Sequence, residues 1–171
     1  MIRKLLLFAV LFTTVIFCSS AQTTTQNIQA DTSKIAIILC SSVNIENYQN
    51  CNPTELTSQD INKIESLLTR FIRDYNDAQK KQYNKLSAEA KSKHVLLTLN
   101  LDLFKRQYIP TIDENGDRVV WLNLFCNDLA TDWHKEIIRS SGERMCNFKI
   151  HINLTKNKTF DFRLLYAKNS I

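Results

Sequence analysis

The C-terminal part of the chain alternates apolar and polar residues over two segments that are separated by a short polar turn. Every second side chain is apolar in residues 148–154, and again in residues 160–166 after the turn. Such alternation is typical of a strand with one buried face, because successive side chains of a strand point to opposite sides. The two segments therefore predict an antiparallel hairpin with one apolar face. The residues that we expect to point inward are Phe148, Ile150, Ile152, Leu154, Phe160, Phe162, Leu164 and Tyr166.

A long amphipathic helix is predicted earlier in the chain. Thr57 occupies an N-cap position and Asp60 follows three residues later, as in a capping box, while Leu56 is placed to pack on Ile61. No glycine or proline ends the pattern, so the helix is expected to stop within residues 84–93. Its apolar stripe recurs at steps of three and four and comprises Ile61, Ile64, Leu68, Phe71, Ile72, Tyr75 and Ala78.

Three further segments predict strands. Residues 34–40 form a short, continuous apolar run, which favours a strand that is buried on both faces and central in a sheet. Residues 97–103 alternate leucine with polar residues, and strand structure is expected to continue through residues 104–112, either without interruption or with a break near Asp102. The Asn-Gly pair at 115–116 then predicts a hairpin turn, with residues 118–126 as the returning strand.

The order of these elements is strand, long helix, then four strands. It predicts an α+β domain in which one long helix packs on a four- to five-stranded, mainly antiparallel sheet. That order resembles the cystatin-type α+β roll. The resemblance covers the order of elements only, since the chain has no motif of the cystatin inhibitors, and sheets covered by one helix host many functions.

The start of the chain has the features of a secretory signal peptide. A basic start precedes the apolar run of residues 5–17, and small residues lead to a cleavage site after Ala21. The run of about 13 residues is shorter than the roughly 20 that a membrane-spanning helix needs. A lipidated Cys18 is an alternative, but Phe17 directly before it argues against a lipoprotein signal. The chain is therefore divided into a signal peptide over 1–21, a disordered leader over 22–33 and a single α+β domain over 34–171.

Composition excludes several classes of function. The formal net charge of +5 falls when the basic start is cleaved. The remaining excess of basic over acidic residues is small and is not typical of a protein that binds nucleic acid. The chain has only two glycines, so a phosphate-cradling loop and a dinucleotide fingerprint are excluded. The nucleophile elbow, the HExxH helix and the CxxC pair are also missing. We expect no cofactor and no metal site, although Asp132, His134 and Glu136 could gather a metal ion if their loop were extended.

Four cysteines remain after cleavage: Cys40, Cys51, Cys126 and Cys146. An even number in an exported chain suggests disulfides. Each consecutive pair flanks one loop, which favours the pairings Cys40–Cys51 and Cys126–Cys146, with four thiols as the alternative. A zinc site is disfavoured because the spacing lacks a CxxC or HxxxH pair.

Two surface features are candidates for binding. A two-residue turn at 115–116 would place Tyr108, Trp121 and Phe125 together with Pro110, as a second buried layer or as an exposed aromatic patch. The opposite face would then hold Ile109, Leu122, Leu124 and Cys126, whereas a three-residue turn with a glycine bulge would reassign both faces. The second feature is the C-terminal hairpin, whose outward basic residues include Lys149, Lys156, Lys158 and Arg163.

These observations predict a secreted or periplasmic binding module without catalysis, which contacts a protein or envelope ligand through a sheet face or hairpins. The C-terminal hairpin is the expected place of any contact with an anionic surface. We expect no specific nucleic-acid partner and no transmembrane span after processing. The alternatives are a small thiol-dependent or hydrolytic enzyme whose residues converge in a cleft, and a structural envelope protein. A thiol enzyme must keep a reactive cysteine, whereas a module with two disulfides does not.

Overall fold

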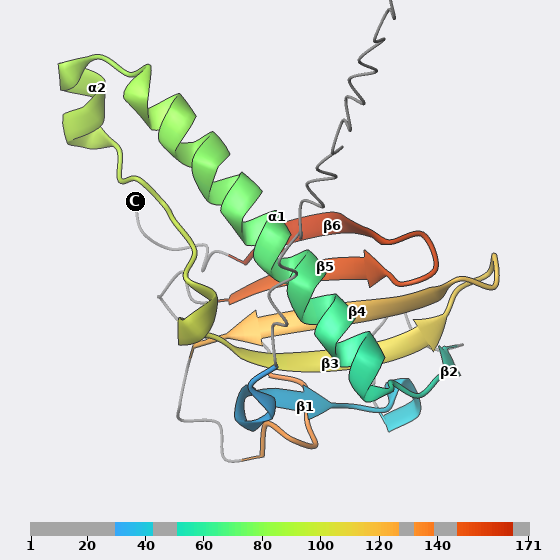
Figure 1. The fold of residues 1–171 in the computed structure, drawn as a ribbon. Helices are drawn as coiled ribbons and strands as arrows, with labels where there is room; N and C mark the ends of the chain where they lie inside the picture. The colour runs from blue at the N-terminus through green and yellow to red at the C-terminus, as the bar shows by residue number, and fades with distance from the viewer. Residues whose placement is uncertain (1–29, 43–50, 127–131, 139–146, 166–171) are drawn as a thin grey trace, which may run out of the picture.

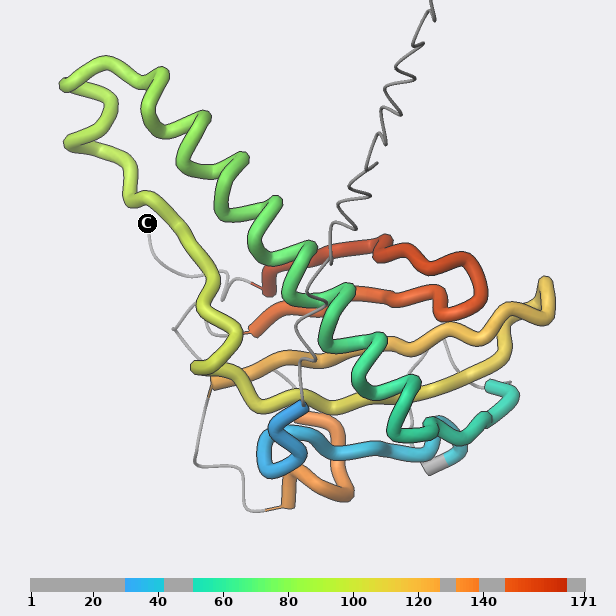
Figure 2. The backbone as a smooth tube through the Cα atoms, viewed as in Figure 1, coloured from blue at the N-terminus to red at the C-terminus, as the bar shows by residue number. Residues whose placement is uncertain are grey.

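A computed structural model describes residues 30–42, 51–126, 132–138 and 147–165. In it, one long helix lies across a face of a six-stranded mixed sheet (Figures 1 and 2). The predicted α+β class is therefore confirmed, with a sheet that is mainly antiparallel. The predicted signal peptide lies outside the described residues. Among the helices that are described, none is long and apolar enough to cross a membrane.

The sheet follows the order β1-β3-β4-β5-β6, and β2 pairs with β3 on the side where β1 lies. Its strands are β1 (Ile35–Ile37), β2 (Asn52–Pro53), β3 (Lys105–Ile112), β4 (Arg118–Phe125), β5 (Asn147–Asn153) and β6 (Lys158–Leu164). β1 runs parallel to β3, and the other pairs are antiparallel. The central position expected for β1 is wrong, since β1 ends the strand order. Ile37 and Leu39 are accordingly 43% and 56% exposed.

The long helix α1 (Ser58–Asn84) begins where the sequence predicts. The Thr57 side chain accepts a hydrogen bond from the Asp60 amide, and the Asp60 carboxylate accepts one from the Thr57 amide, so the capping box is complete. Arg118 on β4 donates to both Asp60 oxygens at 3.0 and 2.8 Å, and this contact lowers the pKa of Asp60 to about 2. The remaining helical elements are α2 (Ala88–Lys93) and the 3₁₀ turns η1 (Thr32–Lys34), η2 (Cys40–Ser42) and η3 (Leu101–Leu103).

The main core lies between α1 and the sheet. Ile64 and Leu68 of the helix stripe are fully buried there, against β4 and β5. The inward positions of β5 are as predicted: Phe148, Ile150 and Ile152 are all fully buried. Smaller clusters lie away from this core, one built from Ile38, Cys40, Ile109 and Trp121 and the other from Ala36, Phe125 and Trp133. The sheet is thus apolar on both faces over β3 and β4.

The strand expected over residues 97–103 is wrong. Residues 94–100 have no regular structure, and η3 follows them directly. The backbone of Leu99 instead pairs with the side chain of Asn76 on α1: its amide donates to Oδ1 at 2.8 Å, and its carbonyl accepts from Nδ2 at 2.7 Å. The Asn76 side chain therefore satisfies backbone groups that a neighbouring strand would otherwise bond. The segment with alternating leucines consequently lies beside α1 and is not a strand of the sheet.

The turn between β3 and β4 has three residues and not two. The amide of Asp113 donates to the Asp117 carbonyl at 2.9 Å, the Gly116 amide donates to the Asp113 carbonyl at 3.0 Å, and Gly116 has a positive φ of 79°. This is the glycine-bulge arrangement, which shifts the register by one residue. Tyr108 therefore pairs with Leu122 on the helix-covered face. The grouping of Tyr108 with Trp121 is corrected accordingly.

Strand β6 contains a bulge that the alternation did not predict. Its register against β5 shifts between Lys149 and His151, and Asp161 has a φ of 49°. Phe162 still points inward, with its ring 4.9 Å from that of Phe71 on α1. Phe160 instead pairs with His151 on the opposite face and is 41% exposed, so its predicted inward position is wrong. Tyr166 lies outside the described residues.

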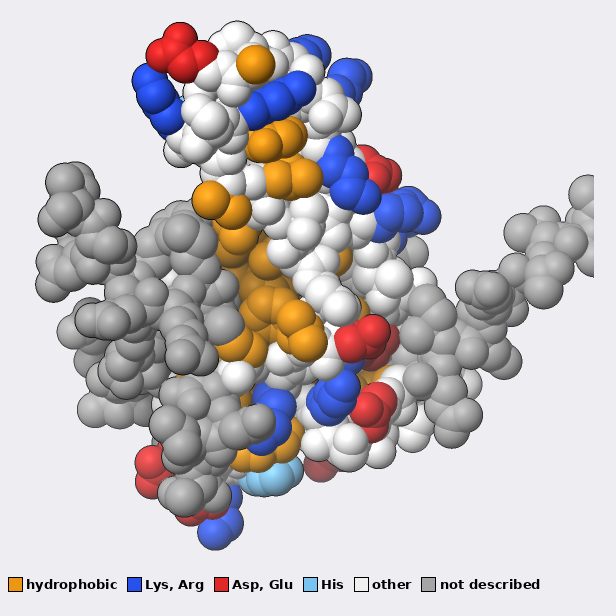
Figure 3. Space-filling view, turned by 90° about the vertical axis from the view of Figure 1, so that its left-hand side faces the viewer, with side chains coloured by type: hydrophobic (Ala, Val, Ile, Leu, Met, Phe, Trp, Pro, Cys, Tyr) orange, Lys and Arg blue, Asp and Glu red, His pale blue; other side chains and the backbone are white. Residues whose placement is uncertain are grey.

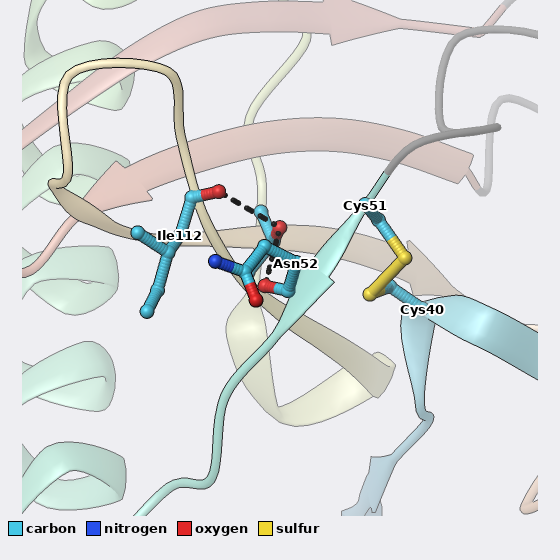
Figure 4. The surroundings of a disulfide bond; sticks show 5 residues. Cys40, Cys51, Asn52 and Ile112 are labelled. Atoms are coloured by element: carbon cyan, nitrogen blue, oxygen red, sulfur yellow. Dashed lines mark hydrogen bonds between the residues drawn. A yellow bond between two sulfur atoms is a disulfide. The ribbon is translucent and has the colours of Figure 1, made fainter.

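The predicted disulfide between Cys40 and Cys51 is confirmed, with 6.1 Å between the two Cα atoms. It joins η2, which follows β1, to the residue before β2 (Figure 4). The Thr111 hydroxyl on β3 donates to the Asn52 carbonyl at 3.0 Å and so holds β2 in place. Cys126 is also disulfide-bonded. Its predicted partner, Cys146, lies outside the described residues, so that pairing stays a prediction.

Candidate functional site

The aromatic residues proposed as a contact patch are part of the core. Tyr108 and Phe125 are fully buried, and Trp121 is 4% exposed. Residues 132–138 pack over this side of the sheet, where the Gln107 side-chain amide donates to the carbonyls of Trp133 and Glu136 at 2.6 Å each. The hairpin β3–β4 therefore offers no exposed aromatic patch among these three residues. The alternative of a second buried layer holds for Trp121 and Phe125, whereas Tyr108 lies in the main core.

The basic residues of the C-terminal hairpin divide into two groups. Lys149 and Arg163 lie directly opposite each other in the β5–β6 register. The Lys149 ammonium lies 5.0 Å from the centre of the Trp121 ring, in a cation–π contact. The Arg163 side chain is 68% exposed. The structure therefore brings these two predicted residues together on the face of the sheet that turns away from α1.

Lys156 has a structural contact at the other end of the hairpin. Its ammonium forms an ion pair with Asp117, which also accepts a hydrogen bond from Asn153 at 2.9 Å. These contacts lower the pKa of Asp117 and raise that of Lys156. Lys156 thus ties the β5–β6 turn to the β3–β4 turn. Lys158 is exposed nearby, away from the pair of Lys149 and Arg163.

Beside Lys149 and Arg163 lie three more side chains, His151 of β5 and Phe160 and Asp161 at the bulge in β6, and we call the whole set the outer patch. The ring of Phe160 stacks on that of His151, with the centroids 5.2 Å apart. Asp161 lies between Arg163 and His151: its carboxylate is 2.8 Å from Nε of Arg163 and 3.3 Å from Nδ1 of His151. The outer patch is therefore Lys149, His151, Phe160, Asp161 and Arg163, a half-exposed aromatic ring within a mainly positive group.

The charges of the outer patch act on one another. The hydrogen bond from Arg163 lowers the pKa of Asp161 and the same contact raises that of Arg163, so both stay ionised near neutral pH. Burial lowers the pKa of His151, and Arg163 and Lys149 add to this effect, while Asp161 opposes it. His151 is consequently neutral at pH 7, and the patch carries two positive charges and one negative charge.

The lowered pKa of His151 makes stability depend on pH. In the unfolded chain the imidazole has an ordinary pKa near 6.5, so on acidification the unfolded state takes up this proton before the folded state does. The free energy of unfolding should therefore fall as the pH drops from about 7.5 to about 5. His151→Gln should lose less stability over that range than the wild type in urea unfolding. Equal slopes for wild type and His151→Gln would contradict this assignment.

The described part of the chain contains neither a cysteine outside a disulfide nor a cluster of metal-binding side chains. Its three cysteines, Cys40, Cys51 and Cys126, are all disulfide-bonded. Within the described ranges no three histidine, cysteine or acidic side chains converge on a point where a metal ion could bind. Asp132, His134 and Glu136 therefore do not form such a group, and the ring of His134 instead contacts that of Trp133 at a tilt of 36°, with the centroids 3.8 Å apart.

One buried polar cluster could not be seen in the sequence. Glu65 of α1 forms an ion pair with Arg106 of β3, and both side chains are about 95% buried. The Tyr108 hydroxyl donates to the same carboxylate, and burial, followed by the charge of Glu65, raises the pKa of Tyr108 well above its usual range. The cluster lies between helix and sheet. Because no solvent-exposed group takes part, its role is to join α1 to β3.

The search for similar proteins gave no match to a protein-family model, to a curated protein or to a solved structure.

Proposed function

We propose that the protein is an exported binding module without catalysis, which holds an acidic segment of a protein ligand on the outer patch. The observation that carries the proposal is the cross-strand pair of Lys149 and Arg163 beside the exposed ring of Phe160. Carboxylates accept hydrogen bonds from lysine and, in bidentate geometry, from arginine. The pair offers both kinds of donor on one rigid surface.

The neighbouring groups support this choice of ligand. Asp161 binds Arg163 through Nε and holds the guanidinium in place, which lowers the entropy lost when a ligand binds. Phe160 offers an apolar surface next to the charges, and a peptide can place an apolar side chain there. A ligand with a carboxylate next to an apolar side chain would complement both features.

Other features support export and a role without catalysis. The predicted signal peptide and the Cys40–Cys51 disulfide fit an oxidising compartment, such as the periplasm or the outside of the cell. The thiol-dependent alternative needs a reactive cysteine, and each cysteine of the described segments is in a disulfide. A purely structural envelope protein would not need the outer patch, so the affinity of the patch for a ligand distinguishes that alternative.

The proposal is tested by titrating the protein with poly-L-glutamate in a calorimeter at low salt. The double variant Lys149→Gln/Arg163→Gln should bind at least about tenfold more weakly than the wild type, because both charge-assisted contacts are lost. The matched control is Lys135→Gln/Lys158→Gln, which removes the same charge at two exposed positions outside the patch. If both double variants lose affinity equally, only net charge matters and the proposed site is wrong. Lys156 is kept, since replacing it would break its ion pair with Asp117.

A further inference from the structure

Helix α1 extends well beyond the sheet and carries α2 at its free end. Figures 1 and 2 show this extension, with the segment after α2 returning beside α1 towards the sheet. We call residues 79–95 the arm. Local contacts shape it: Ser87 caps α2 by accepting a hydrogen bond from the Ala90 amide at 3.2 Å, and the Tyr83 hydroxyl donates to the Lys91 carbonyl at 3.4 Å. The arm is thus an ordered projection.

The arm is strongly basic. Among its residues a single acid, Glu89, stands against five lysines, Lys80, Lys81, Lys85, Lys91 and Lys93. Glu89 pairs with Lys93 at 2.9 Å. Figure 3 shows blue side chains gathered over this upper part of the molecule. Most of the positive charge of the arm is therefore not balanced within the arm, and an anionic partner would be attracted to it.

Apolar side chains accompany this charge. Val95 is 93% exposed at the end of the arm, the highest exposure among the large apolar residues that are described. Leu96 and Leu97, which follow it in the chain, and Leu86 are half-buried. In Figure 3 an apolar stripe runs from the arm down towards the sheet, between the blue side chains. An exposed valine contributes nothing to the binding of a soluble polyanion. On a membrane, however, its side chain can enter the boundary between lipid headgroups and acyl chains.

From this combination we infer that the arm binds the surface of a membrane that contains anionic phospholipid. The lysines lie at the headgroups, and Val95 enters the interface. Basic residues beside a small apolar surface are the features by which peripheral proteins recognise such membranes. Among the described residues the arm extends farthest from the sheet, which places it well to meet a flat surface (Figure 1). It shares no residue with the outer patch, and the inference does not rest on the proposed function.

The test is sedimentation of the purified exported protein with vesicles of phosphatidylcholine, with and without one third of phosphatidylglycerol. We expect binding to the anionic vesicles alone. The triple variant Lys80→Gln/Lys81→Gln/Lys85→Gln should bind the anionic vesicles about 100-fold more weakly than the wild type does. Each lysine near the surface contributes about a fivefold gain in affinity, and the three factors multiply. The control Arg70→Gln/Lys135→Gln/Lys158→Gln removes the same charge at exposed positions outside the arm and should bind nearly as the wild type does.

A second variant separates a membrane from a soluble polyanion. Val95→Ser should bind the anionic vesicles several-fold more weakly, since an apolar contact is lost, and should bind polyphosphate as tightly as the wild type. Failure of the wild type to sediment with anionic vesicles would overturn the inference, as would equal losses in the two triple variants. If Val95→Ser binds vesicles like the wild type while the arm lysines are needed for polyphosphate, the arm is a site for a polyanion and not for a membrane.

Discussion

Replacing Arg106 by methionine is expected to lower the free energy of unfolding by about 3 to 5 kcal/mol. Arg106 and Glu65 are 5% and 4% exposed, and they join β3 to α1 across the main core. Methionine would fill much of the space of the arginine side chain but would leave the Glu65 carboxylate buried without its cation. An uncompensated buried charge is among the costliest single changes in a folded protein. Urea unfolding at neutral pH measures the difference.

Two further variants identify the cause of this loss. Arg73→Met removes an arginine whose partner, Asp74, is 63% exposed, and should change stability by no more than about 0.5 kcal/mol. The triple variant Glu65→Leu/Arg106→Met/Tyr108→Phe removes all three polar side chains and should recover most of the lost stability, because no buried carboxylate is left without its cation. The Phe104 carbonyl loses its hydrogen bond from Arg106 in both variants, so the recovery should not be complete. A loss below about 1 kcal/mol for Arg106→Met alone would show that the ion pair does not have the role described here.

The double variant Cys40→Ala/Cys51→Ala should lose about 3 kcal/mol of stability. The disulfide closes a loop with a sequence separation of 11, and the chain-entropy model gives this magnitude for a loop of that length. The disulfide also joins the segments of β1 and β2, which both pair with β3, so its removal should loosen this edge of the sheet. Thermal unfolding of the two proteins without reductant measures the effect.

Reductant provides the control for this prediction. Dithiothreitol also reduces the disulfide of Cys126, so the reduced wild type should be less stable than the double variant without reductant. The double variant should still lose stability when it is reduced, by the contribution of the Cys126 disulfide. A double variant that melts within a degree of the wild type would contradict the stabilising role of Cys40–Cys51.

Local patterns predicted much of the fold correctly. The capping box at Thr57 placed the start of α1 at the right residue, because the cap depends on side chains only three positions apart. The alternation in β5 gave the correct buried face, since a strand beside a large core has a single way to bury Phe148 and Ile150. Both features are determined by neighbours in the sequence.

The wrong predictions concern backbone geometry and contacts between distant residues. The hairpin at Gly116 is confirmed, but its turn has the three-residue form that the sequence left open as the alternative. That turn and the bulge at Asp161 each depend on one residue with positive φ, and a pattern with a period of two does not reveal such a residue. The leucines of 97–103 do alternate, yet Asn76, more than 20 residues earlier, bonds to the backbone there. The ion pair of Glu65 with Arg106 joins residues 41 positions apart.

The candidate site was predictable in part. Alternation along β5 and β6 was enough to place Lys149 and Arg163 outward on neighbouring strands, and the register confirms that they are opposite. Phe160 was missed because the bulge turns it outward. The pairing of Lys156 with Asp117 was also missed, since it depends on two turns meeting in space. The lysines of the arm gave a signal in the sequence, five basic residues against one acid, which a charge count over a short window would detect.

The central claim is that the outer patch holds an acidic ligand, and NMR spectroscopy of the ¹⁵N-labelled protein tests it most directly. On titration with poly-L-glutamate, the largest amide shifts should fall on the strands of the patch, around Lys149, His151 and residues 160–163. The shifts should disappear in Lys149→Gln/Arg163→Gln and persist when the lysines of the arm are replaced by glutamine. Shifts that are confined to the arm, or that spread evenly over the basic surface, would contradict the claim.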